Sequence, residues 1–222
     1  ITFTLVLHLD FIVFSKLYCF FEIGIISEII KVIYYVVRNE ATHGGYLPKT
    51  DLPFHLCSVQ LFFMFFLKVV IKNESTKEKL LGFMAPIMLV GAFLAIMIPT
   101  VGVKFTKPQV YEYFIYHAML IFFALYILIE KMVKYDWKSF LRNLGFLGIM
   151  AMCSFYINSI LSKTNEKVNF MYLSRPPMEN LPLLNLNHGW AVYVMILGIL
   201  GVSFMFIYHL IMIIIQKKVQ KM

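Results

Sequence analysis

Seven apolar runs, each close to the length of a bilayer crossing, leave this chain few folds to adopt. A transmembrane helix needs about 20 mostly apolar residues, because it must cross about 30 Å of hydrocarbon while its backbone polar groups bond to one another. The runs cover residues 2–17, 23–38, 53–71, 80–98, 109–129, 143–161 and 188–215. The sequence therefore predicts an all-α, polytopic transmembrane helical bundle with seven spans.

The composition supports the membrane class and leaves no room for a separate soluble domain. Hydrophobic residues make up 60% of the chain and charged residues 14%, with a mean hydropathy of +0.78. We therefore predict a single integral membrane domain over residues 1–222. The net charge of +8 could suggest nucleic acid, but the Lys and Arg residues lie at the ends of apolar runs. We accordingly expect membrane lipid, and no nucleic acid, as the partner.

The first 38 residues can be divided in two ways. As one helix they would reach about 57 Å, far more than a bilayer requires. Charged residues interrupt them at Asp10, Lys16 and Glu22. We therefore predict two segments, 2–17 and 23–38, that turn around residues 16–22. If residues 1–38 cross only once, the bundle has six spans.

Positive charge predicts how the chain is oriented. With the C-terminus inside, twelve Lys and Arg residues lie at cytoplasmic ends and seven in outer loops, which favours a cytoplasmic C-terminus. The long polar interval 162–187 is then outside, where it could form a lid. The bias toward Phe, Ile, Lys, Asn and Tyr suits an AT-rich bacterial genome, so the expected location is a bacterial cell membrane.

The start of the third span carries several polar side chains in a strongly apolar context: His55, Cys57, Ser58 and Gln60. Such groups are costly in a membrane unless they meet partners, so they mark a functional site. Capping of the helix start is the structural alternative for His55. Because Ser58 lies three positions from His55, a Ser–His pair is a local rival nucleophile site.

Other spans bring polar residues to a similar depth in the outer leaflet. Cys57 is about 6 Å below the outer end of its span, His117 about 12 Å and Glu28 about 15 Å. Asn158 lies just below the outer end of the sixth span. A thiol and an imidazole at similar depth could perform nucleophilic acyl chemistry on a lipid ester, with a further polar group orienting the imidazole. The structural alternative for Glu28 is that it neutralises Lys31, three positions away on the same helix face.

Other functional classes remain alternatives. The polar residues could form a pocket in a small-molecule binding or transport protein, or the chain could be a non-catalytic membrane scaffold. No HExxH motif or paired cysteine spacing is present, so we expect neither a metal nor another cofactor.

Four motifs in order resemble those of YwaF-type bacterial integral membrane proteins. They are Leu-Pro-x-His-Leu-Cys at 52–57, Tyr-His at 116–117, Asn-x-Met-Tyr-Leu-x-x-Pro at 169–176 and His-Gly-Trp at 188–190. That family is similar to a eukaryotic multispanning cysteine-dependent phospholipid acyltransferase, and more distantly to androgen-induced-protein hydrolases. The resemblance implies a lipid acyltransferase or acyl hydrolase with Cys57 as acyl acceptor and His117 as base.

We therefore predict two sets of site residues. The catalytic set is Cys57, His117, Glu28 and Asn158. The substrate-binding set is His55, Ser58, Gln60, Asn169 and Tyr172.

Overall fold

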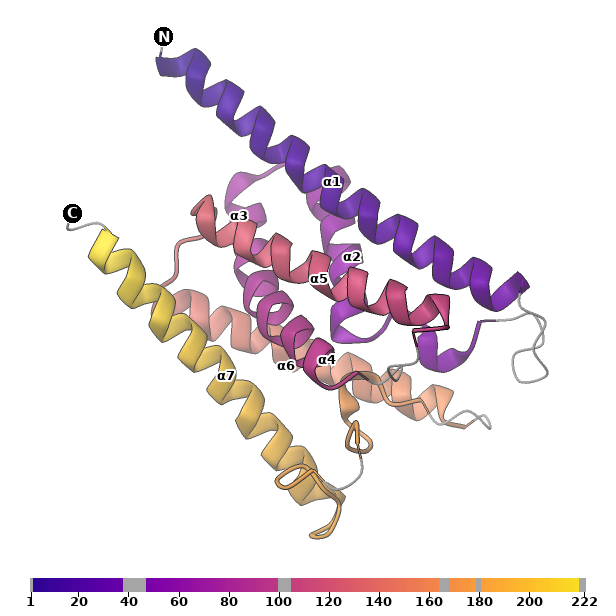
Figure 1. The fold of residues 1–222 in the computed structure, drawn as a ribbon. Coiled ribbons are helices and arrows are strands. Elements are labelled where there is room, and N and C mark those ends of the chain that lie inside the picture. Colours follow the sequence, from indigo (N-terminus) through magenta and orange to yellow (C-terminus); the bar gives the residue numbers. More distant parts are fainter. Residues whose placement is uncertain (1, 38–46, 100–104, 164–167, 179–180, 220–222) are drawn as a thin grey trace. The chain divides into compact units, whose positions relative to one another are not determined.

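The computed structural model describes residues 2–37, 47–99, 105–163, 168–178 and 181–219, with side chains from residue 19 onward. Every regular element within these residues is helical, which confirms the all-α prediction (Figure 1). The long elements are α1 (Thr2–Val37), α2 (Leu56–Phe65) with the π-helical η2 (Phe66–Val70), α3 (Glu74–Pro86) with the π-helical η3 (Ile87–Gly91) and α4 (Ala92–Met97), α5 (Pro108–Ile129), α6 (Trp137–Leu161) and α7 (Trp190–Val219). Two short 3-10 turns are η1 (Lys49–Asp51) and η4 (Phe170–Tyr172).

The first apolar region forms one helix, so the predicted turn around residues 16–22 is wrong. The 36 residues of α1 are continuous. No glycine or proline lies between residues 2 and 23. Lys and Glu are good helix formers, so charge alone did not break the backbone. Glu22 instead forms an ion pair with Lys68 of η2, at 3.7 Å.

Four helices of the described part are long and apolar enough to cross a membrane, rather than the seven predicted. They are Glu74–Met97, Pro108–Ile129, Trp137–Leu161 and Trp190–Val219. The predicted third span corresponds to the shorter apolar helix Leu56–Val70. The helices therefore belong to a multi-pass membrane protein.

The fourth predicted span changes its helical pitch after a proline. Pro86 has no N–H to donate and its ring crowds the preceding turn, so the regular i to i−4 ladder is disturbed there. The chain accommodates this with the π-helical η3 and then resumes as α4. Gly91 is the last residue of η3.

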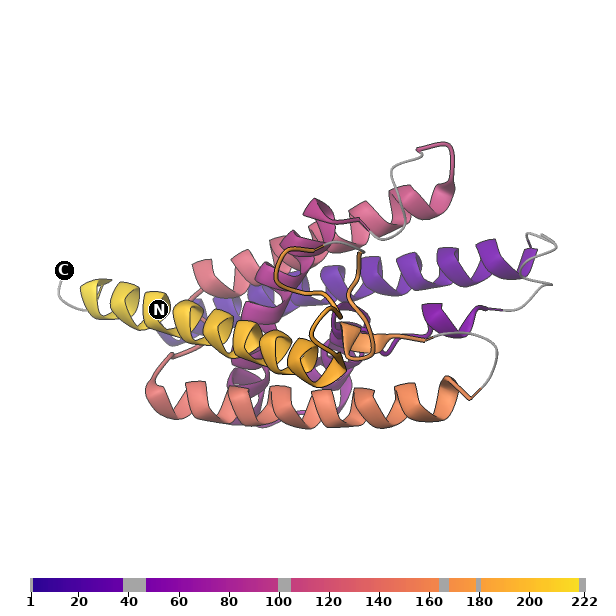
Figure 2. The same cartoon turned by 90° about the horizontal axis from the view of Figure 1, so that it is seen from below.

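The chain divides into two compact units, each described by itself. The first contains residues 1–46 and 57–133. In it α5 packs against α1 and against α3–α4, and α1 and α5 lie side by side in Figures 1 and 2. Leu120, Phe123 and Ala124 of α5 are fully buried. Gly24 lets α1 approach closely, because a Cβ atom there would lie 2.7 Å from Cδ1 of Leu61.

The second unit contains residues 47–56 and 134–222. A capping box begins α6: the Asp136 carboxylate accepts from the Ser139 amide at 2.6 Å, and Ser139 Oγ accepts from the Asp136 amide at 2.9 Å. α6 and α7 pack antiparallel, with buried Asn143 bonded to Nε2 of buried His209 at 3.2 Å. Tyr135 in the linker before α6 is also buried, which raises the pKa of its phenol well above the usual value.

Candidate functional site

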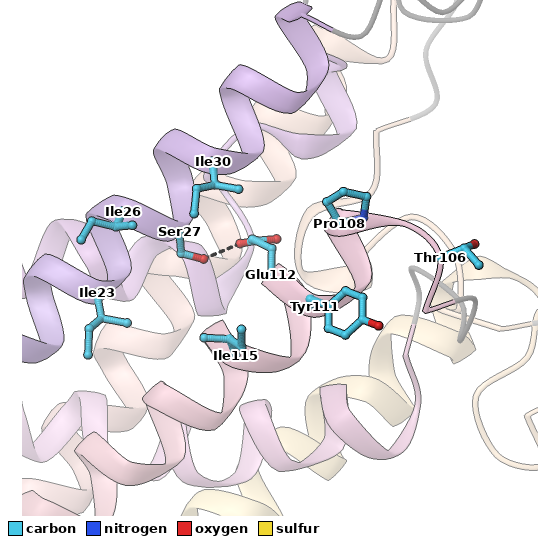
Figure 3. Close-up of a pocket in the computed structure, with 9 residues that line it drawn as sticks. All are labelled: Ile23, Ile26, Ser27, Ile30, Thr106, Pro108, Tyr111, Glu112 and Ile115. Atoms are coloured by element: carbon cyan, nitrogen blue, oxygen red, sulfur yellow. Dashed lines mark hydrogen bonds between the residues drawn. The ribbon is translucent and has the colours of Figure 1, made fainter.

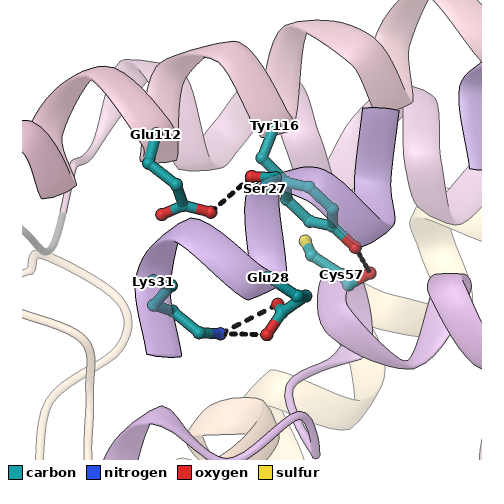
Figure 4. A network of polar contacts seen from close by, with 6 residues as sticks. All are labelled: Ser27, Glu28, Lys31, Cys57, Glu112 and Tyr116. Carbon is teal, nitrogen blue, oxygen red and sulfur yellow. Dashed lines mark hydrogen bonds and ion pairs between the residues drawn. The ribbon is translucent and has the colours of Figure 1, made fainter. Parts of the chain in front are cut away.

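The Cys57 thiol lies at the start of α2, in a crowded part of the first unit. Tyr116 of α5 is buried, and its hydroxyl donates to the Cys57 carbonyl oxygen at 3.0 Å (Figure 4). This bond joins the turn of α2 that carries the thiol to the turn of α5 that carries His117. On the other side, a Cβ atom at Gly91 would lie 3.9 Å from Cys57 Sγ. The Cys57 sulfur therefore faces Gly91, the last residue of the π-helical η3, which has no side chain. π-Helical segments are often found at functional sites.

His117 is buried in α5, and its tautomer follows from one hydrogen bond. Nδ1 lies 2.7 Å from the carbonyl oxygen of Tyr113, which can only accept, so Nδ1 carries the proton. A neutral ring then keeps its lone pair on Nε2, as a general base requires. Among the hydrogen bonds of the described residues, none joins the His117 ring to Cys57 Sγ. Their predicted partnership in catalysis remains a prediction.

Glu28 forms the ion pair that its spacing from Lys31 suggested. Lys31 Nζ lies 2.8 Å from Oε1 and 2.6 Å from Oε2 of Glu28, and both side chains are mostly covered (Figure 4). The preceding residue, Ser27, donates from Oγ to Oε1 of Glu112 at 2.6 Å. A second carboxylate, that of Glu112 on α5, thus lies against α1 next to Ser27, one position before Glu28.

The predicted site residues leave out three members of this polar cluster, Ser27, Glu112 and Tyr116, although Tyr116 belongs to the Tyr-His motif at 116–117. Glu112 carried a usable signal, because an acidic residue inside an apolar span marks a functional site by default. It is also four positions before Tyr116, so the two lie on one face of α5. Ser27 carried no comparable signal, since an isolated serine in an apolar run is common in membrane helices.

Ser58 and Gln60 lie on the same helix as Cys57. Gln60 is fully buried, and Ser58 is half-buried. Both belong to the first unit. Their predicted part in substrate binding stays a prediction.

His55 belongs to the second unit, where it lies among aromatic rings. Its ring centre is 5.1 Å from that of Phe170 and 5.8 Å from that of Tyr172. Phe54 packs edge-on against Phe170, with ring centres 5.4 Å apart. The local contacts of His55 are therefore to the 168–175 loop.

The side chains of Asn158 and Asn169 form hydrogen bonds with the backbone of that loop. Asn158 is buried; it donates to the Phe170 carbonyl at 3.0 Å and accepts from the Phe170 amide at 2.8 Å. Asn169 Oδ1 accepts from the amides of Ser174 and Arg175, at 3.0 and 3.3 Å. These bonds give both residues a structural role. An orienting role for Asn158 in catalysis stays a prediction.

The loop backbone adopts a conformation that needs such support. Met171 and Tyr172 both have φ of 55°, the left-handed region that side chains disfavour. The Tyr193 hydroxyl donates to the Tyr172 carbonyl, and Trp190 Nε1 donates to that of Leu173 at 2.9 Å. This part of the predicted lid is thus held to the start of α7; residues 164–167 and 179–180 of the lid lie outside the described residues.

A metal centre is not apparent in the parts of the chain that the structure describes. There, no group of three or more His, Cys, Asp or Glu residues is arranged to hold an ion.

The helices and the polar residues within them define a multi-pass integral membrane protein. Residues 3–212 match the model of the TMEM164 family, so the chain belongs to the TMEM164 family. No curated protein and no solved structure gives a significant match. The YwaF-type resemblance therefore stays an expectation.

Proposed function

We propose that the protein transfers or hydrolyses acyl groups of membrane lipids, with Cys57 as nucleophile and His117 as general base. The observation that carries the proposal is the hydrogen bond from Tyr116 to the Cys57 carbonyl, because it holds the two helix turns with the thiol and the imidazole together. The link between the family and acyltransferase-like lipid metabolism points to the same chemistry.

In this mechanism His117 Nε2 accepts the thiol proton, and the Cys57 sulfur attacks the carbonyl carbon of a lipid ester. The ester C–O bond breaks, and the released alkoxide takes the proton from the imidazolium. The acyl group is then held as a thioester on Cys57. A second hydroxyl, from water or an acceptor lipid, gives its proton to His117 and attacks the thioester carbonyl carbon. The C–S bond breaks, and the released thiolate takes the proton from the imidazolium, which restores the thiol and the neutral imidazole.

The remaining predicted residues have supporting parts in this proposal. Glu28 would form its ion pair with Lys31 beside the site, so that neither charge lacks a counter-charge there. Ser58 and Gln60 would contact the substrate near the nucleophile. His55, Asn169 and Tyr172 belong to the second unit, and their part in substrate binding stays a prediction.

We also propose the orientation with a cytoplasmic C-terminus and the 162–187 interval outside, as the charge distribution predicts.

The experiment is a trap for the thioester. The purified full chain is incubated in lipid nanodiscs with a phospholipid that carries a clickable acyl chain, and labelled peptides are identified by mass spectrometry. We expect label on Cys57 that neutral hydroxylamine releases. His117→Ala should slow labelling by at least about 100-fold, the usual contribution of a general base.

Two exposed cysteines supply matched controls. Cys19 and Cys153 lie on apolar surfaces, so Cys19→Ser and Cys153→Ser should leave the labelling unchanged. Label that persists in Cys57→Ser, or that is spread equally over all three cysteines, would exclude Cys57 as the nucleophile.

A further inference from the structure

Gly91 lies where the π-helical η3 passes into α4, and it leaves space beside the Cys57 sulfur. A Cβ atom at position 91 would lie 3.9 Å from Cys57 Sγ. Apart from the backbone nearby in its own helix, no other heavy atom of the described residues lies within 4 Å of that position. Both residues are partly exposed. The side of the sulfur that faces Gly91 is therefore open.

Neither the backbone nor the packing requires a glycine at this position. Gly91 has φ of −64° and ψ of −45°, the ordinary helical conformation. A separation of 3.9 Å is a normal van der Waals contact. Gly24 differs, because its Cβ atom would lie 2.7 Å from Leu61 Cδ1. Alanine would therefore fit at position 91, and it is the better helix former.

The π-helical segment decides which residue faces the sulfur. A π-helical turn closes on the fifth residue instead of the fourth, so residues after it are shifted by about one position relative to a regular α-helix. Gly91 is the last residue of this segment, which follows directly after Pro86. The disturbance at the proline thus places a position without a side chain beside the thiol.

Other sides of the polar cluster carry hydrogen-bonded side chains. Between α1 and α5, Ser27 donates to Glu112 at 2.6 Å (Figure 3). Buried Tyr116 lies against Cys57 from α5, with its hydroxyl on the Cys57 carbonyl oxygen (Figure 4). An incoming group therefore meets less protein on the side of Gly91 than on the side of Tyr116.

We propose that the ester carbonyl of a membrane lipid reaches the Cys57 sulfur from the side of Gly91. This inference rests on the acyl chemistry proposed above. Reacting atoms in a productive complex are about 3–3.5 Å apart, so a carbonyl carbon on this side of Sγ would occupy the place of a Cβ atom at position 91. Glycine at this position lowers the stability of the helix but leaves that place to the substrate.

Gly91→Ala distinguishes this role from a structural one, because its two expected effects have opposite signs. The Tm of the full chain in nanodiscs should stay the same or rise, since alanine fits and favours helix. Acylation of Cys57 by the clickable phospholipid should fall by at least about tenfold, because a displacement of about 1 Å can cost about 100-fold in rate. A lower Tm, or acylation as fast as in the unsubstituted protein, would overturn the proposal.

Gly198→Ala is the matched control. Gly198 lies within α7, and a Cβ atom there would meet nothing within 4 Å. This substitution should also keep or raise Tm, but it should leave the acylation of Cys57 unchanged. An equal loss of acylation in both variants would exclude a particular role for Gly91.

Alkylation tests the same opening without acyl transfer. Iodoacetamide and 2-iodopropanamide differ by one methyl group on the reacting carbon, and exposed Cys153 gives the reference rate for each reagent. Relative to Cys153, Gly91→Ala should slow the reaction of Cys57 with the branched reagent at least about fivefold more than that with iodoacetamide, the effect of one methyl group too many in a packed space. Equal slowing of both reagents, or no reaction of Cys57 with iodoacetamide in the unsubstituted protein, would contradict the opening.

The two measurements separate this inference from the proposed reaction. Alkylation that depends on reagent size in Gly91→Ala, with no thioester in any variant, would support the opening and refute the acyl chemistry. A thioester that forms at the same rate in Gly91→Ala as in the unsubstituted protein would refute the role of Gly91 alone.

Discussion

Removing the charge of Glu28 tests whether its pair with Lys31 stabilises the first unit or serves the site. The exposed fractions of the two side chains are 20% for Glu28 and 14% for Lys31, and the closest N–O distance is 2.6 Å. Glu28→Gln keeps the size of the side chain but leaves the Lys31 ammonium mostly covered and without its counter-charge. The expected result is a loss of stability that a neutral partner at position 31 repairs.

The burial of the pair sets the size of the effect. Breaking a fully buried pair costs about 3–5 kcal/mol, and the residual exposure here favours the lower end, about 3 kcal/mol. For a chain of this length each kcal/mol lowers Tm by about 2–4 °C, so Glu28→Gln should lower Tm by about 6–12 °C. The double variant Glu28→Gln/Lys31→Met buries no lone charge and should lie within about 1 kcal/mol of the unsubstituted protein.

Thermal unfolding of the four proteins of this double-mutant cycle gives the coupling energy. We expect at least about 2 kcal/mol, the difference between the loss in Glu28→Gln and that in the double variant, plus whatever Lys31→Met costs alone. The pair of Glu74 and Lys77 is the control. It has the same spacing and a distance of 2.7 Å, but Glu74 is 72% exposed, so Glu74→Gln should cost less than about 1 kcal/mol. Additive effects at positions 28 and 31 would refute the stabilising pair. An unchanged Tm in Glu28→Gln together with lost Cys57 acylation would instead assign Glu28 to the site.

Three further predictions concern orientation and packing. In a background without other cysteines, Ser174→Cys should react with an impermeant maleimide in intact cells, and labelling only after lysis would reverse the orientation. Gly24→Leu should lower Tm by separating α1 from α2, because even a Cβ atom would approach Leu61 to 2.7 Å, and overpacking costs about 1–3 kcal/mol. Asn158→Ala should remove both hydrogen bonds to the Phe170 backbone and expose residues 168–178 to limited proteolysis; resistance equal to that of the unsubstituted protein would contradict the supporting role.

The sequence alone determined the helical membrane class, because the length of an apolar run and the need to satisfy its backbone leave few other structures in a bilayer. It also indicated the ion pair of Glu28 and Lys31 as the alternative to a catalytic role for Glu28, since a spacing of three residues places both on one helix face. It did not predict the continuity of α1. Charged residues that looked like a break were compatible with helix, and one of them, Glu22, has a partner on η2.

Tertiary structure decided which polar residues meet. Ser27 and Glu112 are 85 positions apart, and Tyr116 and Cys57 are 59 apart, so no local periodicity relates them. Their contacts depend on how closely α1, α2 and α5 approach. That distance depends on particular atoms, such as the missing Cβ of Gly24, rather than on the apolar pattern that identifies each helix. Hydropathy repeats along one helix, whereas a site is assembled from the faces that several helices turn toward one another.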